Sequence, residues 1–237
     1  MKKTVLLLLA LATGTIATAQ DHKFEVHAKG SGNSTWLFNN NISNTGDQQD
    51  YAPGWGFNYG LGFVAYFGKV GVGIEGLMGS HTGAYQGTYR VSFGNTVISE
   101  TDYNSNIKLN TVQVPLLFKV RSETGFYFEL GPQFNLIQSA KYTRTMDGGN
   151  KASGDASSYY NKNYFSGVMG LGFGINLGKA PIAILAGLRL QYSFTDLKGV
   201  DAIGTDLSNT TAYPKYEKTS AASAGLMLGA IYKFGNN

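Results

Sequence analysis

The sequence has 237 residues, with 32 glycines, no cysteine and a formal net charge of +4 at pH 7. The lack of cysteine excludes disulfide scaffolds, cysteine-based metal sites, thiol nucleophiles and lipid attachment through a thiol. With 43% apolar residues the chain is too hydrophobic to be disordered, whereas its mean hydropathy of −0.13 is too low for a bundle of membrane helices.

Residues 1–19 have the layout of a cleaved secretory signal peptide. Two lysines precede an unbroken apolar run at residues 5–12, and small residues end in Ala-Thr-Ala at 17–19. The run is far shorter than the ~20 residues that a membrane-spanning helix needs, so we expect cleavage there and one mature domain over residues 20–237. Removing the signal leaves 17 basic residues (19 minus 2) against 15 acidic ones. This near balance argues against a nucleic-acid partner.

The rest of the chain alternates between large apolar and small or polar residues. In residues 126–136, for example, Phe128 and Leu130 alternate with Glu129 and Gly131, which is the period of a β-strand. Short connections at residue 68, residues 121–123 and residue 179 alternate with connections of about 18, 26, 23 and 24 residues, as in outer-membrane barrels. The pattern predicts eight strands, at residues 23–38, 56–67, 69–80, 107–120, 124–140, 164–178, 180–195 and 220–234.

The composition of the two faces of these strands indicates which face contacts lipid. The face opposite the large apolar side chains is rich in glycine and charge, as at Gly170, Gly172 and Arg189. Such a face cannot form the core of a soluble sandwich or a lipocalin-like barrel, so the apolar face must contact lipid. We therefore predict an all-β fold: an eight-stranded antiparallel transmembrane β-barrel, an up-and-down meander with short periplasmic turns and long extracellular loops, in the bacterial outer membrane.

The charges on the inward face predict a filled interior. An eight-stranded barrel is just wide enough for side chains to fill it. Unpaired charges in so narrow a space would be costly, and the near balance of sign therefore predicts a paired network and a plugged lumen instead of a diffusion pore. The inward charged residues are Glu25, Lys29, Glu75, Lys119, Glu129, Arg189 and Lys233.

Aromatic residues gather near the expected membrane boundaries. Part of this set is typical of the aromatic girdle that anchors barrels at the level of the lipid headgroups. The residues assigned to the girdle are Trp36, Trp55, Tyr85, Tyr142, Tyr164, Tyr232 and Phe234.

The second long connection contains a hairpin signal. Residues 88–93 and 96–100 have strand composition and flank the turn pair Gly94-Asn95. We predict that the third and fourth strands project beyond the bilayer and offer an edge for strand addition. Stiffening of the loop alone is the alternative interpretation.

Three segments resemble a known family. Residues 112–119, Val-Gln-Val-Pro-Leu-Leu-Phe-Lys, resemble the L-E-I-P-L-L-x-K strand of the PorT-like outer-membrane β-barrel family; residues 131–141 and 188–197 resemble its G-P-Y and R-Y-x-x-G-L segments. The resemblance implies an eight-stranded outer-membrane barrel; most members of that family lack an assigned activity, and its namesake supports a secretion system.

The last predicted strand also resembles a known signal. Residues 229–234 are similar to the assembly signal that the barrel-insertion machinery reads, with Gly229, Tyr232 and Phe234 at the signal positions.

Candidate catalytic groups are few. His81 follows Ser80, with Glu100 and Asp102 in the same connection, but neighbouring residues of a strand point to opposite faces. We expect no catalytic, cofactor-binding or metal-binding residue. The predicted function is a non-enzymatic barrel whose extracellular loops interact with a partner or surface, or which supports envelope integrity. The alternatives are an accessory component of a secretion or assembly machine and a lipid-modifying enzyme at the rim. The predicted partners are outer-membrane lipid, the barrel-assembly machinery and an extracellular or secretion-system protein.

Overall fold

A computed structural model describes residues 22–94, 96–178 and 180–235, so the predicted signal peptide lies outside the described residues. None of the helices in these segments is long and apolar enough to cross a membrane. The elements are β1 (His22–Phe38), α2 (Asn40–Ser43), β2 (Asp50–Ala52), β3 (Gly54–Phe67), β4 (Val70–Phe93), β5 (Thr96–Arg121), β6 (Phe126–Met146), β7 (Lys151–Asp155), β8 (Asn163–Asn176), β9 (Ile182–Ser193) and β10 (Ser220–Phe234), with 3₁₀ turns at Gly46–Gln48 and Ser157–Tyr159.

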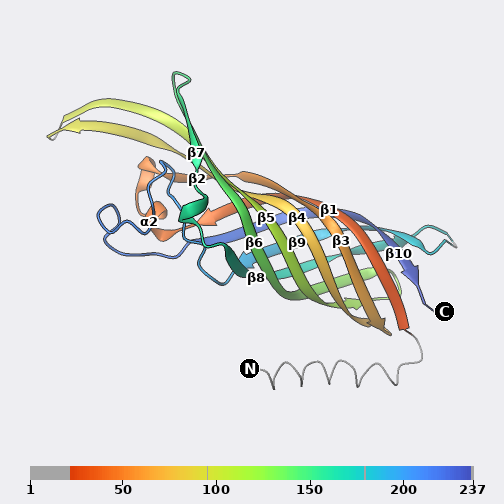
Figure 1. The fold of residues 1–237 in the computed structure, drawn as a ribbon. Helices are drawn as coiled ribbons and strands as arrows, with labels where there is room; N and C mark the ends of the chain where they lie inside the picture. The colour runs from red at the N-terminus through yellow and green to blue at the C-terminus, as the bar shows by residue number, and fades with distance from the viewer. Residues whose placement is uncertain (1–21, 95, 179, 236–237) are drawn as a thin grey trace, which may run out of the picture.

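Eight of the strands form a closed ring. Each long strand pairs antiparallel with its neighbour in the order β1-β3-β4-β5-β6-β8-β9-β10, and β10 pairs with β1 to close the ring. The short strands β2 and β7 are added to β4 and β6 at the end of the ring that carries the long loops (Figure 1). The fold is therefore an all-β antiparallel meander, and we refer to its two ends as the short-turn end and the long-loop end.

The eight predicted strands correspond to the eight strands of the ring, with shifts of up to six residues at their ends, except where β4 and β5 meet. One predicted connection is wrong. Residues 81–106 form no loop, because β4 continues to Phe93 and β5 begins at Thr96, with Gly94 at φ +59° in the turn between them. The result is the projecting hairpin that the Gly94-Asn95 signal predicts, and it extends well past the rest of the ring (Figure 1).

A band of large apolar side chains surrounds the ring. Leu226 on β10 is 70% exposed and Leu61 on β3 is 62% exposed. Water-soluble monomers rarely expose continuous apolar surface of this extent, so the band is suited to lipid. It includes Val26, Leu61, Phe63, Val72, Ile74, Leu116, Phe118, Leu130, Phe134, Met169, Leu171, Ile184, Leu188, Leu226 and Leu228, from all eight strands of the ring.

Candidate functional site

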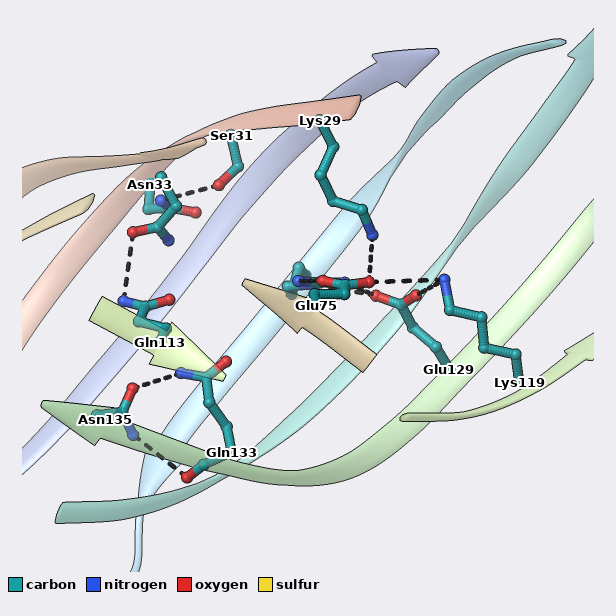
Figure 2. A network of polar contacts seen from close by, with 11 residues as sticks. Lys29, Ser31, Asn33, Glu75, Gln113, Lys119, Glu129, Gln133 and Asn135 are labelled. Atoms are coloured by element: carbon teal, nitrogen blue, oxygen red, sulfur yellow. Dashed lines mark hydrogen bonds and ion pairs between the residues drawn. The ribbon is translucent and has the colours of Figure 1, made fainter. Parts of the chain in front are cut away.

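Five charged residues from five strands meet inside the ring, and we call them the charged cluster: Lys29, Glu75, Lys119, Glu129 and Arg189. Figure 2 labels the first four of them. Glu75 Oε1 lies 2.5 Å from the Lys29 ammonium, and its Oε2 accepts a hydrogen bond from Arg189 Nη1 at 2.8 Å. Glu129 receives Arg189 Nε at 2.9 Å and lies 2.7 Å from the Lys119 ammonium. Because both carboxylates are shared between cations, the cluster links opposite walls of the ring.

Glycines in the neighbouring strands make room for these side chains. Gly62 on β3 is the register partner of Glu75 on β4, and a Cβ there would lie 2.9 Å from Glu75 Cγ. Gly60 is likewise the register partner of Lys29. The high glycine content of the sequence therefore has a local cause: a residue without a side chain lies beside a residue with a long one.

A second ionic group lies closer to the short-turn end. Glu25 binds His27 Nε2 through one carboxylate oxygen at 3.0 Å and Arg121 Nη1 through the other at 2.7 Å. The sequence predicts Glu25 as an inward charge but assigns Arg121 to a turn, where its long side chain reaches back across the ring. Lys233, also predicted as part of the network, makes no ion pair within the described residues and donates to the amide oxygen of Asn176 at 2.6 Å.

Side-chain amides form the next layer toward the long-loop end. Asn135 is fully buried; its Nδ2 donates to the Ser166 hydroxyl at 2.8 Å, and its Oδ1 accepts from Gln133 at 2.6 Å. Gln113, which Figure 2 labels beside Gln133 and Asn135, donates to Asn58 at 3.3 Å. Neutral donors and acceptors satisfy each other here, so the layer needs no counterion.

An apolar core, which we call the apolar cap, occupies the long-loop end. Strand residues such as Leu109 pack against loop residues such as Leu197 and Leu207, all of which are at most 2% exposed. The loops after β1, β7 and β9 therefore bury their own apolar side chains inside the ring. The apolar cap consists of Leu37, Ile42, Tyr85, Tyr103, Ile107, Leu109, Ile137, Ala140, Ala156, Tyr160, Tyr164, Leu197, Val200, Ala202, Leu207 and Ala221.

Asp201 stabilises the longest loop, which connects β9 and β10. Its side chain is 1% exposed; it accepts from the backbone of Ile203 and Thr205 and from the hydroxyl of Tyr213. Gln49 joins this loop to the loop after β1, because its amide oxygen accepts from the backbone of Ala202 at 3.2 Å. Burial and the Asp201 carboxylate raise the pKa of Tyr213 above its ordinary value, so the phenol stays protonated and donates.

The aromatic girdle is predicted wrongly at three positions. Tyr85 and Tyr164 are at most 2% exposed within the apolar cap, and Tyr142 packs against that cap, so none of the three faces lipid. Tyr85 points inward because β4 does not end at residue 80 and its alternation continues. Tyr142 points inward because the β-bulge at Gln138 reverses the alternation of β6.

The other residues assigned to the girdle lie outside the ring. Trp55 is 72% exposed, Tyr232 53% and Phe234 41%, and Trp36 stacks on Phe38. Gly229, Tyr232 and Phe234, the residues of the assembly signal, all pair with β1.

The groups considered for catalysis do not come together. His81 is 3% exposed, and its Nε2 lies 2.9 Å from the backbone oxygen of Trp36. Asp102 accepts from Thr88, and Glu100 pairs with Arg90 farther along the hairpin. No group of three or more histidine or acidic side chains in the described residues could hold a metal ion.

Residues 87–102 form the projecting hairpin, and its two faces differ. Within the described strands, these residues of β4 and β5 pair only with each other, so both outer edges of the hairpin lack a neighbouring strand. Arg90 Nε donates to Glu100 at 2.7 Å on one face. The other face carries the apolar side chains Tyr89, Val91 and Phe93, of which Phe93 is 83% exposed.

The sequence matches the family model of the outer membrane protein beta-barrel domain over residues 18–199. The chain belongs to this family. Membership locates the chain in the bacterial outer membrane and agrees with the lipid-suited band around the ring. No curated protein matches the chain significantly.

Solved structures with a similar course of the chain come from several bacteria. Neisserial surface protein A shares 13% identity over 89% of this chain and 97% of its own, with a TM-score of 0.42. Ail, the attachment invasion locus protein of Yersinia pestis, shares 14% over 90% and 99%, with a TM-score of 0.35. The outer membrane protease OmpT from Escherichia coli shares 10% over 92% and 98%, with a TM-score of 0.36. The three include an attachment protein and a protease, so they do not select a function.

Proposed function

We propose that the ring is a transmembrane β-barrel with a plugged lumen that acts without catalysis, by presenting the projecting hairpin to a protein partner outside the cell. In this orientation the short-turn end faces the periplasm, as short turns do in this architecture. The hairpin is the observation that supports the proposal, because it combines free strand edges with exposed apolar side chains.

Free edges favour recognition by strand addition. An extended peptide that pairs with the edge of β4 or β5 gains main-chain hydrogen bonds, which give affinity. Contacts with every second side chain of the peptide then give specificity. Natural sheets usually protect edges of this kind with short length, proline or charge. Residues 87–102 contain no proline, their charged side chains Arg90 and Glu100 are engaged with each other, and Val91 and Ile98 are 44% and 64% exposed.

The test removes the hairpin and leaves the ring. Residues 88–102 are replaced by Asn-Gly, because Gly87 and Tyr103 are register partners and a two-residue turn can join them. We expect the variant to fold, with an unchanged heat-dependent shift on gels, and to lose binding to the partner. A photo-reactive residue at Phe93 should crosslink that partner, whereas one at Leu226 on the apolar band should not. Protein adducts from both positions, or from neither, would contradict the proposal.

The PorT-like assignment is a second proposal, supported by the resemblance of residues 112–119, 131–141 and 188–197. Under it the chain is an accessory component of a secretion machine. Purification from the outer membrane in mild detergent separates the two functions. Stable copurification of secretion-channel components, retained in the hairpin-deletion variant, would support the accessory role and contradict recognition through the hairpin. A partner lost with the hairpin would support the first proposal.

A further inference from the structure

The ring interior contains a cavity of about 570 Å³ at the short-turn end. It lies on the far side of the charged cluster from the apolar cap, between the turns at Gly68 and Gly178. Its volume is within the range of about 300–1,000 Å³ that is typical of small-molecule sites.

Positive charge predominates in the wall of this cavity. Its lining includes four basic residues, Lys69, Lys119, Arg121 and Lys233, and two acidic ones, Glu25 and Glu123. Both oxygens of Glu25 are already bound, to His27 and Arg121, and Glu123 pairs with Lys69 at the exposed rim. The acidic groups are therefore engaged. Lys69 and Lys119 are engaged as well, with Glu123 and Glu129, which leaves Arg121 and Lys233.

Two cations in the wall have unused hydrogen-bonding capacity. Arg121 uses one guanidinium nitrogen on Glu25, and its guanidinium lies 3.8 Å from the centre of the Tyr66 ring, which fixes its orientation. Lys233 is the register partner of Glu25, and its ammonium has only the neutral amide oxygen of Asn176 as a partner among the described residues. Both cations line the same cavity, Arg121 beside Glu25 on β1 and Lys233 beside Asn176 on β8.

Apolar side chains also line the cavity. Tyr127, Leu185 and Ile231 line the cavity and belong to a small buried cluster with Ala183 and Met227. An amphiphilic wall of this kind orients a ligand with one charged end and one apolar end.

We propose that this cavity binds a small organic anion, whose carboxylate or phosphate group lies between Arg121 and Lys233 and whose apolar part packs on Tyr127, Leu185 and Ile231. The site lies at the opposite end of the ring from the hairpin and is independent of the function proposed for it. It gives the short-turn end a binding role of its own.

The test is calorimetric titration of the full protein in a neutral detergent with benzoate, phenyl phosphate, inorganic phosphate and benzyl alcohol at constant ionic strength. We expect at least one aromatic anion to bind at least tenfold more tightly than benzyl alcohol. Binding of benzoate alone assigns a carboxylate, and binding of phenyl phosphate alone assigns a phosphate. Equal binding of inorganic and phenyl phosphate would overturn the apolar contact, and equal binding of benzyl alcohol, or no binding at all, would overturn the site.

Two lysine variants locate the anion. Lys233→Gln should weaken binding about tenfold, because a charge-assisted hydrogen bond is lost. Lys151→Gln removes the same charge from β7 at the long-loop end, where its side chain is exposed, and should change the affinity less than twofold. Equal effects of the two variants would show general electrostatic attraction and overturn the site. An unchanged heat-dependent gel shift confirms that each variant folds.

Discussion

Glu129 and Arg189 form an ion pair although a whole strand lies between them. Glu129 is on β6 and Arg189 on β9, and the residue of β8 that is the register partner of both is Gly170. Because Gly170 has no side chain, the guanidinium and the carboxylate meet directly above its backbone. The charged cluster therefore depends on Gly170, although this residue has neither a charge nor a side chain.

The first prediction concerns that glycine. A Cβ at Gly170 would lie 2.8 Å from Cγ and Oε1 of Glu129, so Gly170→Ala should displace the carboxylate and destabilise the ring by about 1–3 kcal/mol, as overpacking does. Urea unfolding in lipid vesicles measures the difference. The matched control is Gly76→Ala on β4, where a Cβ would meet nothing within 4 Å. Equal stability of the two variants would contradict the role of Gly170.

The second prediction concerns the carboxylate at the centre of the charged cluster. Glu75→Gln leaves Lys29, Lys119 and Arg189 with a single acidic partner, and loss of one member of a buried ion pair costs about 3–5 kcal/mol. Glu75→Gln combined with Lys29→Met should recover part of this loss, because it removes the cation left unpaired. Glu123→Gln, which breaks the exposed pair with Lys69, should leave the unfolding midpoint unchanged. A Glu75 variant as stable as the wild type would refute the prediction.

The third prediction is a pH dependence in the longest loop. The pKa of Tyr213 is raised in the folded protein, so the folded state holds this proton more tightly than the unfolded state does. Its contribution to stability is complete below the ordinary tyrosine pKa of about 10 and decreases as the pH rises above that value. In a spectrophotometric titration, the wild type minus Tyr213→Phe should show one phenol that ionises above pH ~10. A difference curve centred at or below that pH would contradict the contact with Asp201.

The fourth prediction concerns passage through the ring. If the charged cluster and the apolar cap close the lumen as proposed, the wild type should show no steady conductance in planar bilayers. Leu197→Asp with Leu207→Asp disrupts only the apolar cap and should also stay closed. Adding Glu75→Ala and Arg189→Ala should then produce a measurable current. A steady current through the wild type would contradict the plugged lumen.

Alternation in the sequence is sufficient to predict the eight strands of the ring and most inward charges, although not the lengths of β4 and β5 or the short strands β2 and β7. On β8, Phe165 is 49% exposed and points outward, so alternation alone places the neighbouring Tyr164 inward and excludes it from the girdle. Tyr142 is different, because its direction depends on the β-bulge at Gln138. Nothing in the local sequence distinguishes a bulge from a regular strand there.

Contacts between distant segments could not be predicted in the same way. Arg121 follows the last alternating residues of its strand, and its partner Glu25 is 96 residues away. The apolar cap also joins separate loops, whose apolar residues are scattered among polar ones without a period. The period of the sequence thus identifies the strands that form the wall of the ring. It does not identify the side-chain contacts that join distant segments across the interior.

The pairing of glycines with charged residues has a consequence for strand alignment. Sliding β8 past β6 by two residues would keep every apolar side chain on the outside, so the lipid-facing surface cannot distinguish the two alignments. The same slide would place Val168 or Gly172 opposite Glu129 in place of Gly170. Val168 offers no space for the carboxylate, and either slide moves Gly170 from between Glu129 and Arg189. The inward-facing glycines and charged residues thus specify the stagger of the strands, and with it the width of the ring.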